Sequence, residues 1–169
     1  NTKTKAWSGW VRIADGVTST SYLDKTAKSG YYRYTVKAVN EAGNSGYDAN
    51  GLKTYFLSTP KATTANSNSG VTVKWGKVTG ATGYIVYRKT GNGGWQNLGK
   101  TTSTSYVDKA AKSGTYYRYT VRAENEAGFS GYDANGIKTY FLARPTVSAT
   151  NTNSGVTVKW TKSAGATGY

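Results

Sequence analysis

The chain has no cysteine and no histidine among its 169 residues. Without cysteine it cannot form a disulfide, a zinc-thiolate site or a thiol nucleophile. Without histidine it lacks an imidazole base and an imidazole metal ligand. Both absences count against an enzyme, and we expect no cofactor, no metal site and no catalytic residue.

Long apolar runs are also missing from the sequence. No stretch is long enough to span a bilayer, and no signal peptide opens the chain. We therefore expect an interior or processed piece of a larger protein, with no membrane span.

Acidic residues are few, with 8 Asp and Glu against 22 Lys and Arg and a net charge of +14. This charge favours solubility and attraction to polyanions, including cell-wall glycans, but does not bear on fold. The basic residues are spread along the chain, which is typical of solvated strand faces. Nucleic acid is a disfavoured partner, because the sequence has neither a clustered basic stripe nor a known binding module.

Most of the carboxylates recur in pairs: Asp24 with Asp108, Glu41 with Glu126, and Asp48 with Asp133. A glycosidase needs two carboxylates that flank one bond. Repeated carboxylates beside turns more often accept hydrogen bonds from backbone N–H groups. Residues 133–136, DANG, lack the later ligands of a calcium loop. We interpret these carboxylates as turn caps.

The clearest local pattern lies in residues 113–128, SGTYYRYTVRAENEAG. Tyr117, Tyr119 and Val121 fall on one face, and the residues between them fall on the other. This period of two is typical of a strand with one dry side. Its Tyr, Thr and Val content and the glycines at both ends also favour a strand.

The same pattern occurs twice. Residues 31–57 and 116–142 lie 85 residues apart and differ at only four positions, and residues 66–75 return in nearly the same form at 151–160. The chain is therefore a tandem array of units of about 85 residues.

Short strands separated by turns fill each unit. In order, we expect strands near residues 61–64, 71–75, 84–88, 94–98, 105–108, 116–123 and 137–142. Those at 10–13 and 21–24 belong to the preceding copy. About seven strands with no helical period predict an all-β fold, an antiparallel seven-stranded β-sandwich. The prolines at 60 and 145 place the boundaries, so residues 60–144 form one complete unit. Residues 1–59 are the C-terminal part of a unit, and residues 145–169 are the N-terminal part of another.

The run GTYYRYTVRAEN at residues 114–125, followed by Gly128 and Ser130, resembles the sixth strand of a fibronectin type III domain. Trp75 matches the second-strand tryptophan of that family, and residues 83–88 match its third strand. The resemblance covers a whole unit. It implies that Tyr117 and Tyr32 are corner tyrosines, whose hydroxyls bond back to the chain.

Two residues of the corner loop depart from the family pattern. Ala111 stands where Leu is usual, and Ser113 stands where Pro is common. We therefore expect this loop to pack differently. The phrases GATGY and YRKT resemble repeats of bacterial surface and secreted proteins, which implies an extracellular or cell-surface location, whereas the Arg-Gly-Asp integrin motif is absent.

Aromatic residues divide into two sets by strand alternation. The expected core set is Trp75, Trp160, Tyr117, Tyr32, Tyr119 and Tyr34. The candidate surface-binding set is Trp7, Trp95, Tyr87, Tyr132 and Tyr140. Exposed aromatic rings can stack on sugars or line a protein contact, but cross-strand pairing on a solvent face is the favoured explanation.

Two functions fit these observations. The first is a non-catalytic structural repeat of an extracellular bacterial surface protein or filament: a stalk, spacer or adhesive fibre whose partners are neighbouring repeats of the same protein. The second is a carbohydrate- or cell-wall-binding accessory module of a secreted polysaccharide-active enzyme. The two incomplete ends together amount to about one unit, so we expect either that the end of one copy completes the beginning of the next, or that the chain is a fragment cut inside a domain.

Overall fold

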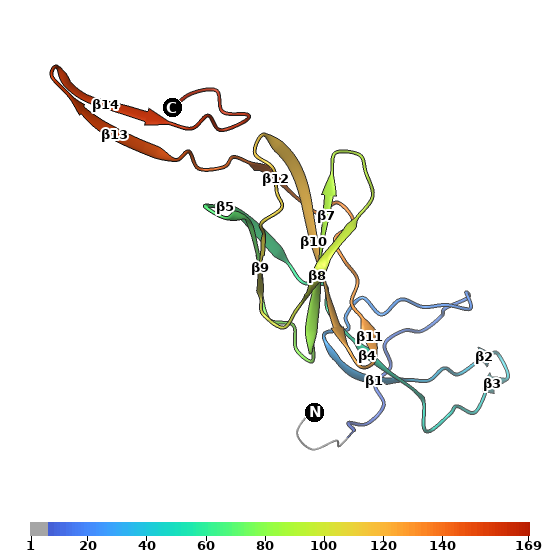
Figure 1. The fold of residues 1–169 in the computed structure, drawn as a ribbon. Helices are drawn as coiled ribbons and strands as arrows, with labels where there is room; N and C mark the ends of the chain where they lie inside the picture. The colour runs from blue at the N-terminus through green and yellow to red at the C-terminus, as the bar shows by residue number, and fades with distance from the viewer. Residues whose placement is uncertain (1–6) are drawn as a thin grey trace.

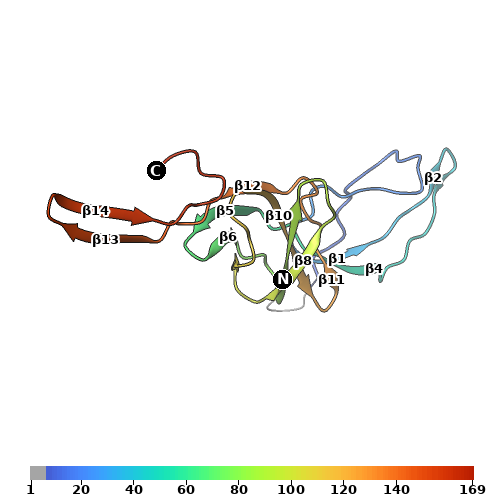
Figure 2. The same cartoon turned by 45° about the horizontal axis from the view of Figure 1, so that its top comes forward.

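The computed structural model describes residues 7–169, and all of their regular structure is β. One two-layered unit lies in the middle of the chain. An N-terminal piece and a C-terminal hairpin extend from opposite ends of it, which gives an elongated molecule (Figures 1 and 2).

The first layer of the central unit is a three-stranded antiparallel sheet in the order β5-β6-β9. Its strands are β5 (Ala62–Ser67), β6 (Gly70–Trp75) and β9 (Ser105–Asp108). A tight hairpin joins β5 to β6, and the chain then crosses to the other layer before it returns as β9.

The second layer is built around the long strand β10, which pairs with β7, β11 and β12, while β8 pairs with the far side of β7. Its strands are β7 (Gly83–Thr90), β8 (Gln96–Thr101), β10 (Thr115–Asn125), β11 (Gly128–Phe129) and β12 (Ile137–Phe141). The predicted all-β sandwich is confirmed, with the two-residue β11 in addition to the expected strands.

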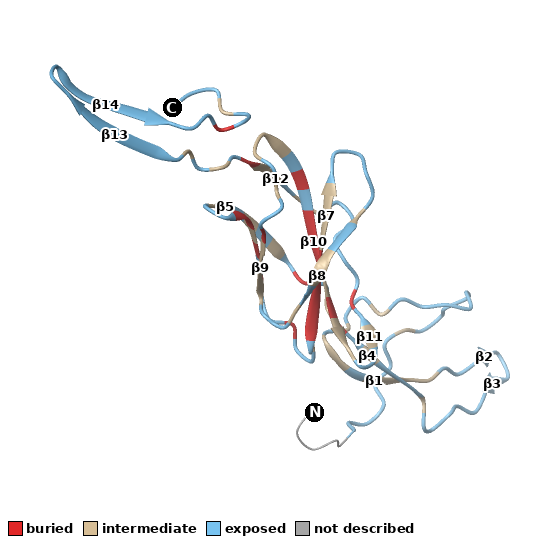
Figure 3. Cartoon of the chain, in the orientation of Figure 1, coloured by how far each residue is buried: buried red, intermediate tan, exposed pale blue. Residues whose placement is uncertain are grey.

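The core lies between the two layers and follows the period of two. Val71, Val73 and Trp75 point inward from β6, while Tyr119 and Val121 face them from β10, and all five are at most 6% exposed. Figure 3 shows these buried positions concentrated along the central strands. Such burial contributes about 1.5–3 kcal/mol for each large apolar side chain.

The N-terminal piece repeats part of this layer without its partners. It contains β1 (Gly30–Tyr34), β2 (Val39–Asn40), β3 (Gly43–Asn44) and β4 (Leu52–Phe56). The β1–β4 register pairs Tyr31 with Tyr55, as β10–β12 pairs Tyr116 with Tyr140. However, residues 10–13 and 21–24, expected as strands, form none, because the piece has no equivalents of β6 and β7 against which they could form ladders.

The C-terminal hairpin consists of β13 (Val147–Thr152) and β14 (Gly155–Trp160). Its register, with Val147 opposite Trp160, repeats that of β5–β6, where Ala62 lies opposite Trp75. No second layer covers it, so Trp160 is 49% exposed and does not lie in a core as expected. Tyr32 and Tyr34 are only half-buried for the same reason.

Candidate functional site

The most distinctive surface feature of the complete unit is a group of aromatic rings around one arginine. We call Trp95, Tyr132, Phe129 and Arg122 the aromatic cluster. The Trp95 and Tyr132 rings meet edge to face, with centroids 6.5 Å apart. The Arg122 guanidinium lies 5.1 Å from the Phe129 ring centroid and 5.7 Å from that of Tyr132, within cation–π range.

Backbone geometry fixes both sides of this cluster. The Asn-Gly turn before β12 holds Gly136 at φ 64°, and a Cβ there would lie 2.5 Å from the Trp95 indole. Only glycine therefore lets the indole approach the turn this closely. On the other side, Arg122 Nε donates a hydrogen bond to the Ser130 carbonyl oxygen at 2.9 Å, which keeps the guanidinium over the rings.

The N-terminal piece repeats the cluster in a shorter form. The rings of Trp10 and Tyr47 have centroids 6.3 Å apart, and Lys37 Nζ lies 4.8 Å from the Tyr47 centroid. Trp10 covers Gly51 as Trp95 covers Gly136. Asn44 stands where the complete unit has Phe129. The N-terminal piece and the complete unit thus each carry an aromatic–cation group.

Of the candidate surface aromatics, the structure brings only Trp95 and Tyr132 together. Trp7 lies apart beside Arg33, with the guanidinium 4.4 Å from the ring centroid. Tyr87 is half-buried on β7. Tyr140 contacts the C-terminal segment through a hydrogen bond from its hydroxyl to the Gly165 carbonyl oxygen. It therefore lies at a junction and not on a free binding face.

Arg122 was not among the candidate site residues. On the outer face of β10 it is one of many basic residues that alternate with core positions. However, Arg122 and Phe129 are two of the four positions at which the copies 31–57 and 116–142 differ. Lys37 and Asn44 of the first copy stand where the second copy has Arg122 and Phe129, two members of the aromatic cluster. That coincidence was the available signal.

A polar group centred on Asp108 is buried inside the sandwich. The Asp108 carboxylate, 3% exposed, accepts hydrogen bonds from Arg88 Nη1 at 2.9 Å and from the Tyr119 hydroxyl at 2.8 Å. Burial, and then the hydrogen bond to Asp108, raise the pKa of Tyr119. Both hydrogen bonds link β9 to the opposite layer, because Arg88 lies on β7 and Tyr119 on β10. We therefore assign Asp108, Arg88 and Tyr119 a structural role.

The paired aspartates act as turn caps. In each of four turns, an aspartate side chain accepts a hydrogen bond from the backbone N–H two residues later; the four are Asp24, Asp48, Asp108 and Asp133. At Asp24 the Thr26 hydroxyl and backbone N–H hold the carboxyl pKa below its usual value. Tyr34 of β1 donates a hydrogen bond to the same carboxylate, and burial and this hydrogen bond raise the pKa of Tyr34 to about 12.

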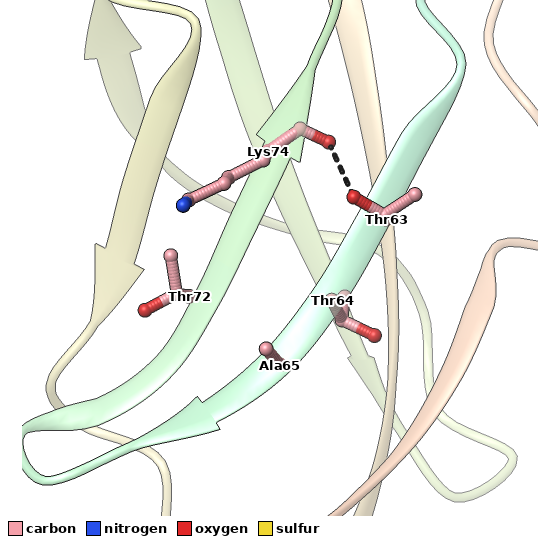
Figure 4. A pocket seen from close by; sticks show the side chains of 5 residues that line it. All are labelled: Thr63, Thr64, Ala65, Thr72 and Lys74. Atoms are coloured by element: carbon pink, nitrogen blue, oxygen red, sulfur yellow. Dashed lines mark hydrogen bonds between the residues drawn. The ribbon is translucent and has the colours of Figure 1, made fainter.

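A shallow hollow lies on the β5–β6 sheet, lined by Thr63, Thr64, Ala65, Thr72 and Lys74 (Figure 4). The Thr63 hydroxyl is used in a hydrogen bond to the Lys74 carbonyl oxygen at 3.4 Å, and Thr64 Oγ1 bonds Thr139 Oγ1 of β12. One lysine among small side chains offers little chemistry to a substrate.

Residues 7–169 hold no group of three Asp, Glu, His or Cys side chains able to bind a metal ion. They also hold no helix with the length and apolar character that a bilayer crossing requires.

Comparison with known proteins gives two similar sequences. The chain is 34% identical over 128 residues to exoglucanase B of Cellulomonas fimi, which covers 66% of the chain and 11% of that protein. It is 30% identical over 115 residues to poly(3-hydroxybutyrate) depolymerase of Ralstonia pickettii, which covers 64% of the chain and 21% of that protein. The chain thus spans about a tenth and about a fifth of these relatives. No family model matches it.

Solved structures with similar folds include an Fn3-like protein from Clostridium thermocellum, at 26% identity and a TM-score of 0.41, which covers 54% of this chain and 94% of that one. Another is a chicken CNTN1 fragment of three domains, at 21% identity and a TM-score of 0.43, which covers 70% of this chain and 44% of that one.

The features that the sequence resemblance implies are present in the central unit. Trp75 lies in the core on the second strand, and the Tyr117 hydroxyl accepts a hydrogen bond from Lys112 N at 2.9 Å across the corner. A three-stranded sheet faces a sheet built on β10, β7, β8 and β12. The complete unit is a fibronectin type III-like β-sandwich.

Proposed function

We propose that this chain is a non-catalytic tandem spacer of a larger extracellular bacterial protein, a stalk or fibre built of sandwiches joined end to end. The observation that carries this proposal is the structural equivalence of the copies. Tyr31 packs on Tyr55 with ring centroids 4.3 Å apart, and Tyr116 packs on Tyr140 at 4.5 Å. A spacer needs such repetition of one mechanical unit.

The proposed partners are neighbouring repeats of the same protein. Val156, Val158 and Trp160 line an exposed face of β13–β14, and their equivalents Val71, Val73 and Trp75 are buried in the complete unit. Strands equivalent to β7, β8, β10 and β12 would cover this face, as those strands cover β5–β6 in the complete unit. An uncovered hairpin of this kind is only marginally stable in water.

The sequence relatives support a non-catalytic role for the region. Both are named as enzymes, and the similarity extends over only 11% and 21% of their lengths. A fibronectin type III-like unit shared by an exoglucanase and a depolymerase fits an accessory part better than either chemistry.

Electron microscopy of the whole protein that contains this chain tests the spacer. We expect a rod with a constant axial repeat of one or two sandwich lengths. Compact single particles without such a repeat would contradict the proposal.

The aromatic cluster favours a second function, a carbohydrate-binding accessory module. Tyr132 and Phe129 are exposed beside a cation, and Trp10 and Tyr47 offer a second such site. Aromatic rings of this kind can stack on sugar rings, and two linked sites raise avidity.

Binding of the chain to insoluble glucan and to purified cell walls tests this second function. We expect a Tyr47→Ala, Tyr132→Ala double variant to lose binding, while Tyr22→Ala, which removes an equally exposed ring outside both sites, retains it. Stacking would survive added salt, whereas attraction of the +14 chain to polyanions would be screened. Unchanged binding by the double variant would exclude the cluster as the site.

A further inference from the structure

The two places where one repeat meets the next share a contact between a tyrosine and a turn. At the first, Tyr55 of β4 lies on the turn before β7, and its hydroxyl donates a hydrogen bond to the Thr79 carbonyl oxygen at 3.3 Å. At the second, Tyr140 of β12 lies on the equivalent turn after β14, and its hydroxyl donates to the Gly165 carbonyl oxygen at 3.5 Å. Tyr55 and Tyr140 are equivalent residues of the two copies.

At each junction the tyrosine side chain packs against a glycine. Gly80 has φ 76° and Gly165 has φ 82°, so both adopt a conformation that other residues rarely take. A Cβ on Gly80 would collide with the Tyr55 hydroxyl, and one on Gly165 would collide with that of Tyr140. The Gly165 Cβ would also lie 2.5 Å from the Gly114 Cα. Backbone and ring are therefore in direct contact.

Ser113 adds a polar clamp at the second junction. Its hydroxyl donates to the Ala164 carbonyl oxygen at 2.7 Å and lies 3.1 Å from the Ser163 hydroxyl, while it accepts a hydrogen bond from Ala143 N at 2.9 Å. Ser163 is 5% exposed and donates to the Ala143 carbonyl oxygen at 2.6 Å. The unusual serine of the corner loop thus bridges the linker and the next repeat.

We propose that this end face is a docking surface whose partner is the turn between the second and third strands of the next repeat. The contact restricts the angle between successive sandwiches, so that an array of them is a stiff rod. This inference rests on the proposed spacer function and assigns Tyr55, Tyr140 and Ser113 to it. It also explains why Tyr140, an outward-facing residue of its strand, is half-buried.

Distance measurement between two spin labels on the 169-residue chain tests the joint. Because the chain has no cysteine, Thr102→Cys on the sandwich and Asn153→Cys at the tip of the hairpin give two unique and exposed label sites. We expect a narrow distance distribution in this labelled parent. A broad distribution in the parent would overturn the proposal.

Three further variants separate the joint from general effects on folding. In the labelled chain, Gly165→Ala should broaden the distance distribution. Gly91→Ala, at φ 54° with open space around the added Cβ, should leave the distribution narrow. Ser113→Ala should also broaden the distribution, and it leaves the sequence of the hairpin intact; an unchanged far-ultraviolet circular dichroism spectrum would show that the hairpin is still folded. A peak unchanged in both Gly165→Ala and Ser113→Ala would refute the joint.

The spin-label distances test the joint, and electron microscopy tests the spacer, so either proposal can fail alone. A broad distribution together with a long array in the microscope would refute the joint and leave a flexible spacer. A narrow distribution in a protein that forms no array would support the contact and refute the spacer.

Discussion

Replacement of Asp108 by alanine should cause a large loss of stability of the complete unit. The Asp108 side chain is 3% exposed and that of Arg88 is 13% exposed, so their ion pair is poorly screened by solvent. The substitution would leave the Arg88 guanidinium without its carboxylate and the Tyr119 hydroxyl without its acceptor. It would also remove the cap from Ala110 N.

The expected magnitude follows from these lost contacts. Removal of one partner of a buried ion pair costs about 3–5 kcal/mol, because the other charge stays buried without compensation. Domains of this size are stable by roughly 5–15 kcal/mol. We therefore expect Asp108→Ala to lower the unfolding free energy by at least about 3 kcal/mol, which is a large fraction of the total.

Urea unfolding followed by circular dichroism measures this loss as a lower midpoint. Asp24→Ala is the matched control, because Asp24 is the equivalent residue of the N-terminal piece and bonds Tyr34 in the same way. It should leave the transition of the sandwich in place. A loss of under about 1 kcal/mol for Asp108→Ala would show that water reaches the group and that the burial argument is wrong.

Three other changes have defined outcomes. Val73→Ala should cost about 2 kcal/mol in urea unfolding because it opens a cavity in the core, whereas Val158→Ala, the same position of the hairpin at 49% exposure, should leave the sandwich transition unchanged. The raised pKa of Tyr119 means that the folded state holds this proton more tightly than the unfolded chain does, so its contribution is complete below pH 10.0 and lost as pH rises above it. Tyr119→Phe should therefore weaken the alkaline fall in melting temperature; an equally steep fall would contradict this. Gly136→Ala should cost more than about 1 kcal/mol and shift the indole fluorescence of the aromatic cluster, whereas Gly91→Ala, with a similar φ but open space, should not shift that fluorescence.

Much of the sandwich could be predicted because its information is local. The alternation in residues 115–125 specifies which side of β10 is dry, and burial of Tyr119 and Val121 follows it. The aspartate caps were equally predictable, because an Asx turn depends only on the two residues that follow.

The candidate site was harder to predict because it depends on distant segments. Trp95 and Tyr132 are 37 positions apart, and the period of two gives the face of each residue but not its neighbour across the sheet. Tyr140 has the same outward period as a free surface residue, yet it is half-buried against Gly165. Its environment depends on the angle between repeats, which no strand pattern encodes.

The two copies of GVTVKW separate what a strand sequence determines from what its surroundings determine. In both hairpins the first glycine has a positive φ, 136° at Gly70 and 144° at Gly155, and its carbonyl oxygen accepts a hydrogen bond at 2.8 Å from a hydroxyl three residues earlier. The turn and the register are therefore local properties. Burial is not, because Trp75 is 6% exposed and Trp160 is 49% exposed within the same hexapeptide. A repeat of this protein therefore becomes a stable unit only when its second layer is present.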